Sequence, residues 1–105
     1  MRRVNESIRE VLGDAIAAEL KDPRIGFVTV TGVDTSPDLR SARVYVSVLG
    51  SEEERESSLA GLRSSHGVLQ SKIASQMRLK RTPTLTFEYD ESVERGDRIT
   101  RLLDE

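Results

Sequence analysis

The stretch SEEERESSLAGLRSSHGVLQSKIASQMRLKRTPTLTFEY, residues 51–89 of the 105, decides the fold that the sequence predicts. Its first four residues, Ser51–Glu54, match the S-x-x-E capping box, so a helix is expected to begin there. Apolar side chains then recur at helical spacing as far as Met77, and the serines and glycine at residues 64–67 are expected to kink or break the helix. Apolar and polar side chains alternate over residues 84–89, which predicts a strand.

A helix and two strands are predicted upstream of this stretch. Apolar residues between positions 4 and 16 recur at spacings of three and four, which predicts an amphipathic helix that runs to about Leu20 and is stopped before Pro23. Residues 27–33 and 43–49 are rich in β-branched side chains and are separated by turn-forming residues. They are therefore expected to form an antiparallel hairpin.

The order of these elements predicts a single α+β domain over residues 1–105. A last helix, over residues 92–103, can bury Val93, Ile99, Leu102 and Leu103. The predicted order is α-β-β-α-(kink)-α-β-α, and its long helical crossover fits parallel pairing between strands 43–49 and 84–89. The expected product is a three-stranded mixed sheet packed with helices.

Composition narrows the classes of function. The sequence has no cysteine, which excludes disulfides, cysteine-ligated zinc and thiol catalysis, and favours a reducing cytosol. Its aromatic residues are two Phe and two Tyr, so the core is expected to rest on Val, Ile, Leu and Ala, without a deep cofactor pocket. Charges interrupt the first 20 residues, leaving no apolar run for a signal peptide or a membrane span. A cytoplasmic protein without a cofactor is expected.

The distribution of charge favours a basic surface in spite of an acidic total. Residues 57–87 contain no acid and five bases, Arg63, Lys72, Arg78, Lys80 and Arg81. Removing these five positive charges from the formal net charge of −2 leaves −7 on the rest of the chain. A polarised domain is therefore expected, with one segment suited to phosphate groups.

Three stretches together resemble the ribosome-binding factor A family: KDPRIG at residues 21–26, LRSARVYVSVL at residues 39–49, and above all MRLKRTPTLTF at residues 77–87. The resemblance covers nearly the whole chain. It implies a KH-like fold of the second topological type. It also implies binding to the free small (30S) ribosomal subunit and its 16S ribosomal RNA, with a role in late maturation, 16S processing and cold adaptation.

The resemblance also implies where RNA is contacted. Family members replace the G-x-x-G loop of KH domains with a helix-kink-helix that carries Ala-x-Gly, and Ser65-His66-Gly67 stands at that place here. Serine in place of alanine is a departure that adds a hydroxyl group. Because the G-x-x-G loop is what lets ordinary KH domains grip a single strand closely, recognition by shape and phosphate charge is expected instead.

Each candidate residue also has a structural explanation. Three bases at positions 78, 80 and 81 are expected at the end of a helix, where the helix dipole favours cations with or without RNA. Arg63 and Lys72 could be ordinary solvated residues on the same helical layer, and Gly67 a helix-capping glycine. The predicted RNA-binding set is Arg63, Ser65, His66, Gly67, Lys72, Arg78, Lys80 and Arg81; Arg40 and Arg43, at the edge of the hairpin, are left out of it.

Two further classes of function remain open beside a monomeric, non-enzymatic assembly factor. The first is a protein-protein adaptor whose basic segment meets an acidic partner. The second, an enzyme, has the weakest support, because the sequence has no P-loop, no G-x-G-x-x-G, no G-x-S-x-G and no pair of histidines. His66 is the only histidine and has no carboxylate neighbours along the chain, so no metal site is expected.

Overall fold

The structure is a computed structural model, and it describes residues 2–18 and 20–92. The predicted helix over residues 92–103 lies, from residue 93 on, outside the described residues. The described elements are α1 (Arg2–Ala18), β1 (Val28–Thr35), β2 (Ser41–Val48), α2 (Glu52–Ser64), α3 (His66–Gln76) and β3 (Thr84–Tyr89).

The strands of the described residues form one mixed sheet in the order β1-β2-β3. β1 and β2 pair antiparallel, from Val28↔Val48 to Thr35↔Ala42, and β2 pairs parallel with β3, from Ser41↔Thr84 to Val46↔Tyr89. The predicted hairpin, the parallel pairing and the α+β class are therefore confirmed.

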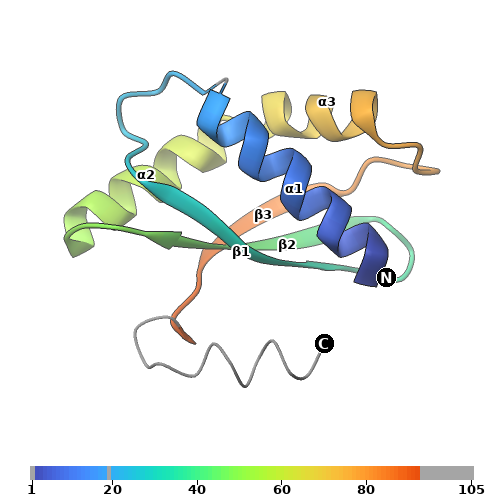
Figure 1. Cartoon of the computed structure of the whole chain (residues 1–105), viewed down its shortest axis with the longest axis horizontal. Coiled ribbons are helices and arrows are strands. Elements are labelled where there is room, and N and C mark those ends of the chain that lie inside the picture. Colours follow the sequence, from blue (N-terminus) through green and yellow to red (C-terminus); the bar gives the residue numbers. More distant parts are fainter. Residues whose placement is uncertain (1, 19, 93–105) are drawn as a thin grey trace.

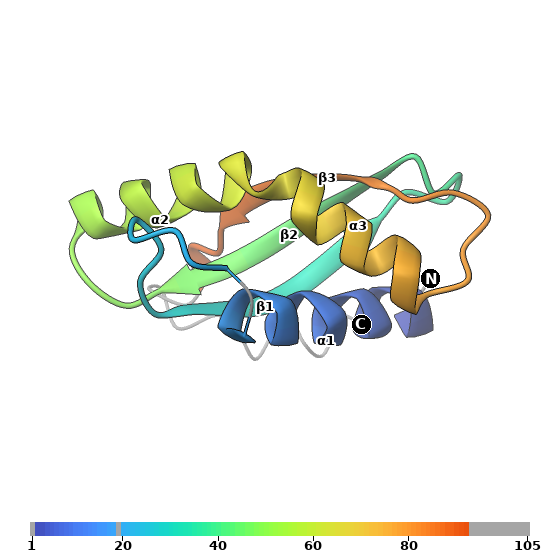
Figure 2. The same ribbon diagram turned by 90° about the horizontal axis from the view of Figure 1, so that it is seen from above.

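The three described helices cover one face of the sheet (Figures 1 and 2). Burial alternates along β2, where Ala42, Val44, Val46 and Val48 are buried and the residues between them are exposed or half-buried. The strand side chains pack with one apolar stripe from each helix, which is the two-layer arrangement expected of an amphipathic helix on a half-buried sheet. The helical part of this core is Ile8, Leu12, Ala15, Ile16, Leu59, Leu62, Leu69 and Ile73.

The capping box predicted at the start of α2 is present. The backbone N–H of Glu54 donates to Ser51 Oγ (3.2 Å), and the backbone N–H of Ser51 donates to Glu54 Oε1 (3.0 Å). Gly50, at φ 132°, turns the chain from β2 into this cap with a backbone conformation that other residues rarely adopt. The capping hydrogen bonds and the turn at Gly50 therefore mark where α2 begins.

The loop between α1 and β1 is held by a close approach to α2. The backbone N–H of Gly26 donates to the hydroxyl of Ser58 (3.1 Å), which is buried on α2. One turn further along, Gly61 faces the side chain of Ile25 so closely that a Cβ on Gly61 would lie 2.6 Å from Ile25 Cγ1. A glycine in the last turn of α2 is thus what lets the loop pack there.

Element boundaries differ from the prediction by one or two residues. The first helix ends at Ala18 instead of Leu20 in the described residues, and the hairpin strands are Val28–Thr35 and Ser41–Val48 instead of residues 27–33 and 43–49. The strands extend further because the backbone N–H of Ser36 donates to Ser41 O (2.9 Å) and shortens the turn. A bulge at Thr31, whose hydroxyl donates to Asp90 Oδ2 (2.6 Å), shifts the register of β1.

The two glycines of the α2–α3 layer give a test of this packing. We expect Gly61→Ala to lower the free energy of unfolding by about 1–3 kcal/mol, because the added methyl group overlaps Ile25. The same change at Gly67 should raise it by about 0.5–1 kcal/mol, since a Cβ there meets no described atom within 4 Å and alanine favours the helix. Urea unfolding of both variants measures the two changes in the free energy of unfolding. Changes of the same sign would contradict the close approach of Gly61 to Ile25.

The pH dependence of the same loop is a second test. The guanidinium and the backbone N–H of Arg24 bind the carboxylate of Asp22 and lower its pKa from 3.8 to about 2. Because the pKa is lower in the folded state, the contact stabilises the protein above pH 4, and this stabilisation is lost as the pH falls toward 2. We expect Arg24→Gln to return the pKa of Asp22 toward 3.8, as followed by NMR titration, while Arg9→Gln leaves it unchanged.

Candidate nucleic-acid interface

The loop between α3 and β3 presents three bases on a firmly anchored backbone. Its apolar residues Met77 and Leu79 pack against the core, and Pro83 at its end is buried. The alternating residues Arg78 and Lys80 are exposed, as is Arg81. Among the described residues none of these three bases forms an ion pair. We call Arg78, Lys80 and Arg81 the basic loop.

The basic loop lies beyond α3, not in its last turn as the sequence suggested. The helix ends at Gln76, and Met77, its C-cap, is already extended. The last turn of α3 contains no base. The dipole of α3 therefore explains less of this cluster than expected, because the effect falls off within the last turn. These exposed cations, which form no ion pair among the described residues, are available to a ligand.

Bases from two other segments lie at the same end of the molecule as the basic loop. The first turn of α1, the β1–β2 turn and the α3–β3 loop come together there (Figures 1 and 2). The backbone N–H of Thr84 donates to Arg40 O (3.0 Å), and the backbone N–H of Thr35 donates to Asn5 Oδ1 (3.0 Å). Exposed Arg2 and Arg3 belong to this first turn of α1. Sequence reasoning did not select them, because only the folded hairpin brings them near the basic loop.

The predicted break between the helices is present at a single residue. Ser65, at φ −98° and ψ 8°, ends α2 and precedes α3. His66 and Gly67 follow it in the first turn of α3 and are exposed. Gly67 has no left-handed backbone conformation and lies inside the first turn of α3, so the alternative explanation as a helix-capping glycine does not apply. The small exposed surface at this break would let a nucleic-acid backbone approach closely.

His66 has one ring nitrogen engaged by the protein. Its Nδ1 lies 2.9 Å from Arg63 O. A carbonyl oxygen only accepts hydrogen bonds, so Nδ1 carries the proton in a neutral ring and Nε2 is left as an acceptor. An acceptor on an exposed helix N-terminus suits a hydroxyl donor such as the 2′-OH of RNA.

The family model of ribosome-binding factor A matches residues 1–103. The chain belongs to this family. Both the family and the fold class that the sequence suggested are thereby confirmed.

Solved structures with this fold include two from family members. The crystal structure of ribosome-binding factor A from Thermus thermophilus is 30% identical, with a TM-score of 0.75 over 84% of this chain and 93% of that chain. The solution NMR structure of a putative ribosome binding factor A from Thermotoga maritima is 36% identical, with a TM-score of 0.75 over 83% of each chain. A homology model of the T. thermophilus factor, fitted into the cryo-EM map of a 30S complex, is 30% identical, with a TM-score of 0.69 over 83% of this chain and 91% of that chain.

The side chain of Arg63 forms a hydrogen bond within the fold itself. Its Nη2 donates to Phe87 O (3.0 Å), and the backbone N–H of Leu85 donates to Gln70 Oε1 (3.1 Å). Both backbone groups point to the outer edge of β3, away from β2. Side chains of α2 and α3 thus cover an exposed sheet edge. The other flanking base, Lys72, is half-buried on α3.

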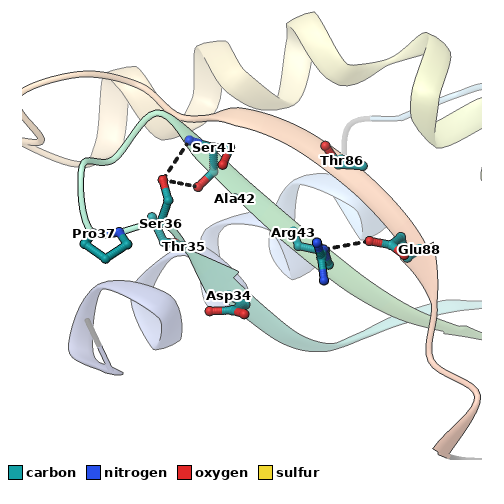
Figure 3. A pocket seen from close by; sticks show the side chains of 9 residues that line it. All are labelled: Asp34, Thr35, Ser36, Pro37, Ser41, Ala42, Arg43, Thr86 and Glu88. Atoms are coloured by element: carbon teal, nitrogen blue, oxygen red, sulfur yellow. Dashed lines mark hydrogen bonds and ion pairs between the residues drawn. The ribbon is translucent and has the colours of Figure 1, made fainter.

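On the open face of the sheet, Arg43 is matched by carboxylates of the protein itself. Arg43 Nη1 donates to the hydroxyl of Tyr45 (3.3 Å), and Arg43 Nε lies 2.9 Å from Glu88 Oε2. The contacts with Tyr45 and then Glu88 raise the pKa of Arg43. The side chains of Arg43 and Glu88 point toward each other in the lining of a pocket that Asp34 also lines (Figure 3). Leaving Arg43 out of the predicted interface is consistent with this geometry.

Some chemistries find no support in the part of the chain that the structure describes. No group of three or more His, Asp or Glu side chains could hold a metal ion among residues 2–18 and 20–92. No helix over the same residues is long and apolar enough to cross a membrane. Near the basic loop the surface offers charge rather than aromatic rings, so phosphate contact is favoured over base stacking.

The structural role of Arg63 can be tested against its predicted role in binding. We expect Arg63→Ala to lower the free energy of unfolding by about 1–2 kcal/mol, because Phe87 O loses a charged donor. Arg78→Ala, at an exposed position without such a contact, should stay within about 0.5 kcal/mol of the native protein. Thermal or urea unfolding measures both. If Arg63→Ala were neutral, Arg63 would return to the set of ligand-contacting residues.

Proposed function

We propose that this chain binds the small (30S) ribosomal subunit through 16S ribosomal RNA and assists its late maturation, including 16S processing and growth in the cold. The observation that carries the proposal is the anchored basic loop, whose three cations have no partner among the described residues. Family membership supports it, as does the relative from T. thermophilus that has been fitted into a map of a 30S complex.

The contact is made to phosphates and to the shape of folded RNA. Arg78, Lys80 and Arg81 bind the backbone and release counterions, with Lys72 beside them on α3. Ser65, His66 and Gly67 form the second point of contact, where small side chains let the RNA approach. The two points are separated by the eleven residues of α3, which is about 16 Å of helix. Arg63 supports the sheet edge instead of the RNA.

The mode of action is occupancy by a monomer, without a chemical step. A protein that binds only the folded arrangement of an RNA raises the population of that arrangement by its differential affinity. Processing enzymes then act on a better-ordered substrate. Alternative base-paired structures exchange more slowly in the cold, so the same shift in population has its largest effect there.

Co-sedimentation with purified small subunits, large subunits and whole ribosomes tests the proposal. The variant Arg78→Ala, Lys80→Ala, Arg81→Ala should bind small subunits on the order of 100-fold more weakly in about 0.15 M salt, with a salt slope shallower by about 2–3. Circular dichroism confirms that the variant is folded. Large subunits should retain neither protein.

A charge-matched control separates the site from net charge. The variant Arg9→Ala, Lys21→Ala, Arg43→Ala loses the same three positive charges at other places and should bind within about threefold of the native protein. If both variants weaken equally, the function stands and the site is wrong. If the native protein binds no subunit, and a partner that it captures from cells stays bound after ribonuclease treatment, a protein-protein adaptor replaces the assembly factor as the proposed function.

A further inference from the structure

Two large apolar side chains are exposed side by side at the end of the sheet. Phe27 is 79% exposed and Leu49 is 75% exposed. They lie opposite each other, one residue beyond β1 and β2, where the backbone N–H of Leu49 donates to Phe27 O (3.1 Å). A single exposed apolar residue needs no explanation, but an adjacent pair this exposed points to an interaction surface.

The pair lies on a rigid groove and cannot easily turn inward. The groove has a volume of about 370 Å³ and runs between the pair and the first turns of α2. On the loop side, Gly26 is bonded to the buried hydroxyl of Ser58, and Ile25 is fixed against Gly61. Phe27 follows directly on these anchored residues. The surface is therefore formed before any partner binds, which lowers the entropic cost of binding.

The rim of the groove is acidic. Glu53 and Glu54 line it, and the hydrogen bonds that Glu54 accepts from Ser51 lower the pKa of Glu54 and keep it ionised. Arg24 also lines the groove, but its charge is matched by Asp22 at 2.6 Å. Glu52, also in the first turn of α2, adds a further carboxylate.

This acidic and apolar surface lies at the opposite end of the molecule from the basic loop. In both views the start of α2 is at one end of the sheet, and the α3–β3 loop is at the other (Figures 1 and 2). RNA phosphates would be repelled by the carboxylates, so a chain that rests on RNA through its basic loop turns this end toward something else. A protein segment rich in Lys and Arg is the partner whose charge complements this acidic end.

We propose that Phe27 and Leu49 form a docking site for a cationic protein segment of the small subunit. An apolar side chain of that segment enters the groove against Phe27 and Leu49, and flanking Lys or Arg side chains meet Glu53 and Glu54. This proposal rests on the proposed function. It adds a protein contact to the RNA contact, and contacts at two ends of one rigid domain fix its orientation as well as its affinity.

Binding to two targets separates the docking site from the basic loop. The variant Phe27→Ser, Leu49→Ser should bind intact small subunits at least about tenfold more weakly and protein-free 16S RNA as well as the native protein does. The control Phe27→Leu, Leu49→Ile keeps an apolar surface and should bind both targets normally. The basic-loop variant should lose both. Because both side chains are exposed, the serine variant is expected to fold, which its thermal midpoint verifies.

A benzophenone amino acid in place of Phe27 identifies what covers the groove. A cross-link to a protein of the subunit, lost with Leu49→Ser, supports the proposal. A cross-link to RNA, to residues 93–105 of the same chain or to a second copy overturns it, and so does equal binding of the serine variant and the native protein to intact subunits.

The docking site remains testable if the native protein binds no subunit and the proposed function fails. Purified small-subunit proteins, free of RNA and tested one at a time, then serve as the probe. Capture of one of them by the position-27 cross-linker, weakened by Glu53→Gln but not by Glu10→Gln, supports the docking site. Capture of none overturns it.

Discussion

Parallel pairing between β2 and β3 is the constraint on which the rest of the structure depends. Two parallel neighbours begin at the same end of a sheet, so the chain that leaves β2 at Val48 must travel back along the whole sheet before β3 begins at Thr84. The α2–α3 layer is that return path. It carries the acidic start of α2 to one end of the molecule and the basic loop to the other. A charge gradient along the sequence thereby becomes a separation in space.

The break at Ser65 follows from the length of this path. α2 and α3 have 13 and 11 residues, which as one straight helix would measure about 36 Å. The eight residues of β2 span only about 27 Å. A helix that changes direction in the middle keeps both halves over the sheet, where Leu62, Leu69 and Ile73 are buried. The change of direction at Ser65 is therefore needed by the fold before any RNA is considered.

Sequence patterns predicted what is local and missed what is brought together from a distance. The capping box at Ser51 and the strand over residues 84–89 were predicted as found, because short-range hydrogen bonds and an alternating pattern decide them. Alternation gives the buried face of a strand but not its free edge. The contact of Arg63 with Phe87 O could not be foreseen for that reason. The candidate site shows the same division. The bases of the basic loop could be found because they are close together in the sequence with no acid near them. Arg2, Arg3 and Arg40 could not, because they come to the same end of the molecule only through the hairpin and the pairing of Thr84 with Ser41.

The electrostatic needs of folding and of the proposed binding coincide in this protein. Carboxylates at the start of α2 are favoured by the positive end of its dipole, and cations just beyond α3 stand on the side of its negative end. The start of α2 therefore stabilises the acids that lie there, and the weak remaining field beyond α3 does not oppose the cations of the basic loop. Because no charge has to be held against the local field, the separation of acids and bases adds no strain to the fold, and a net charge of −2 is compatible with a surface that binds phosphates.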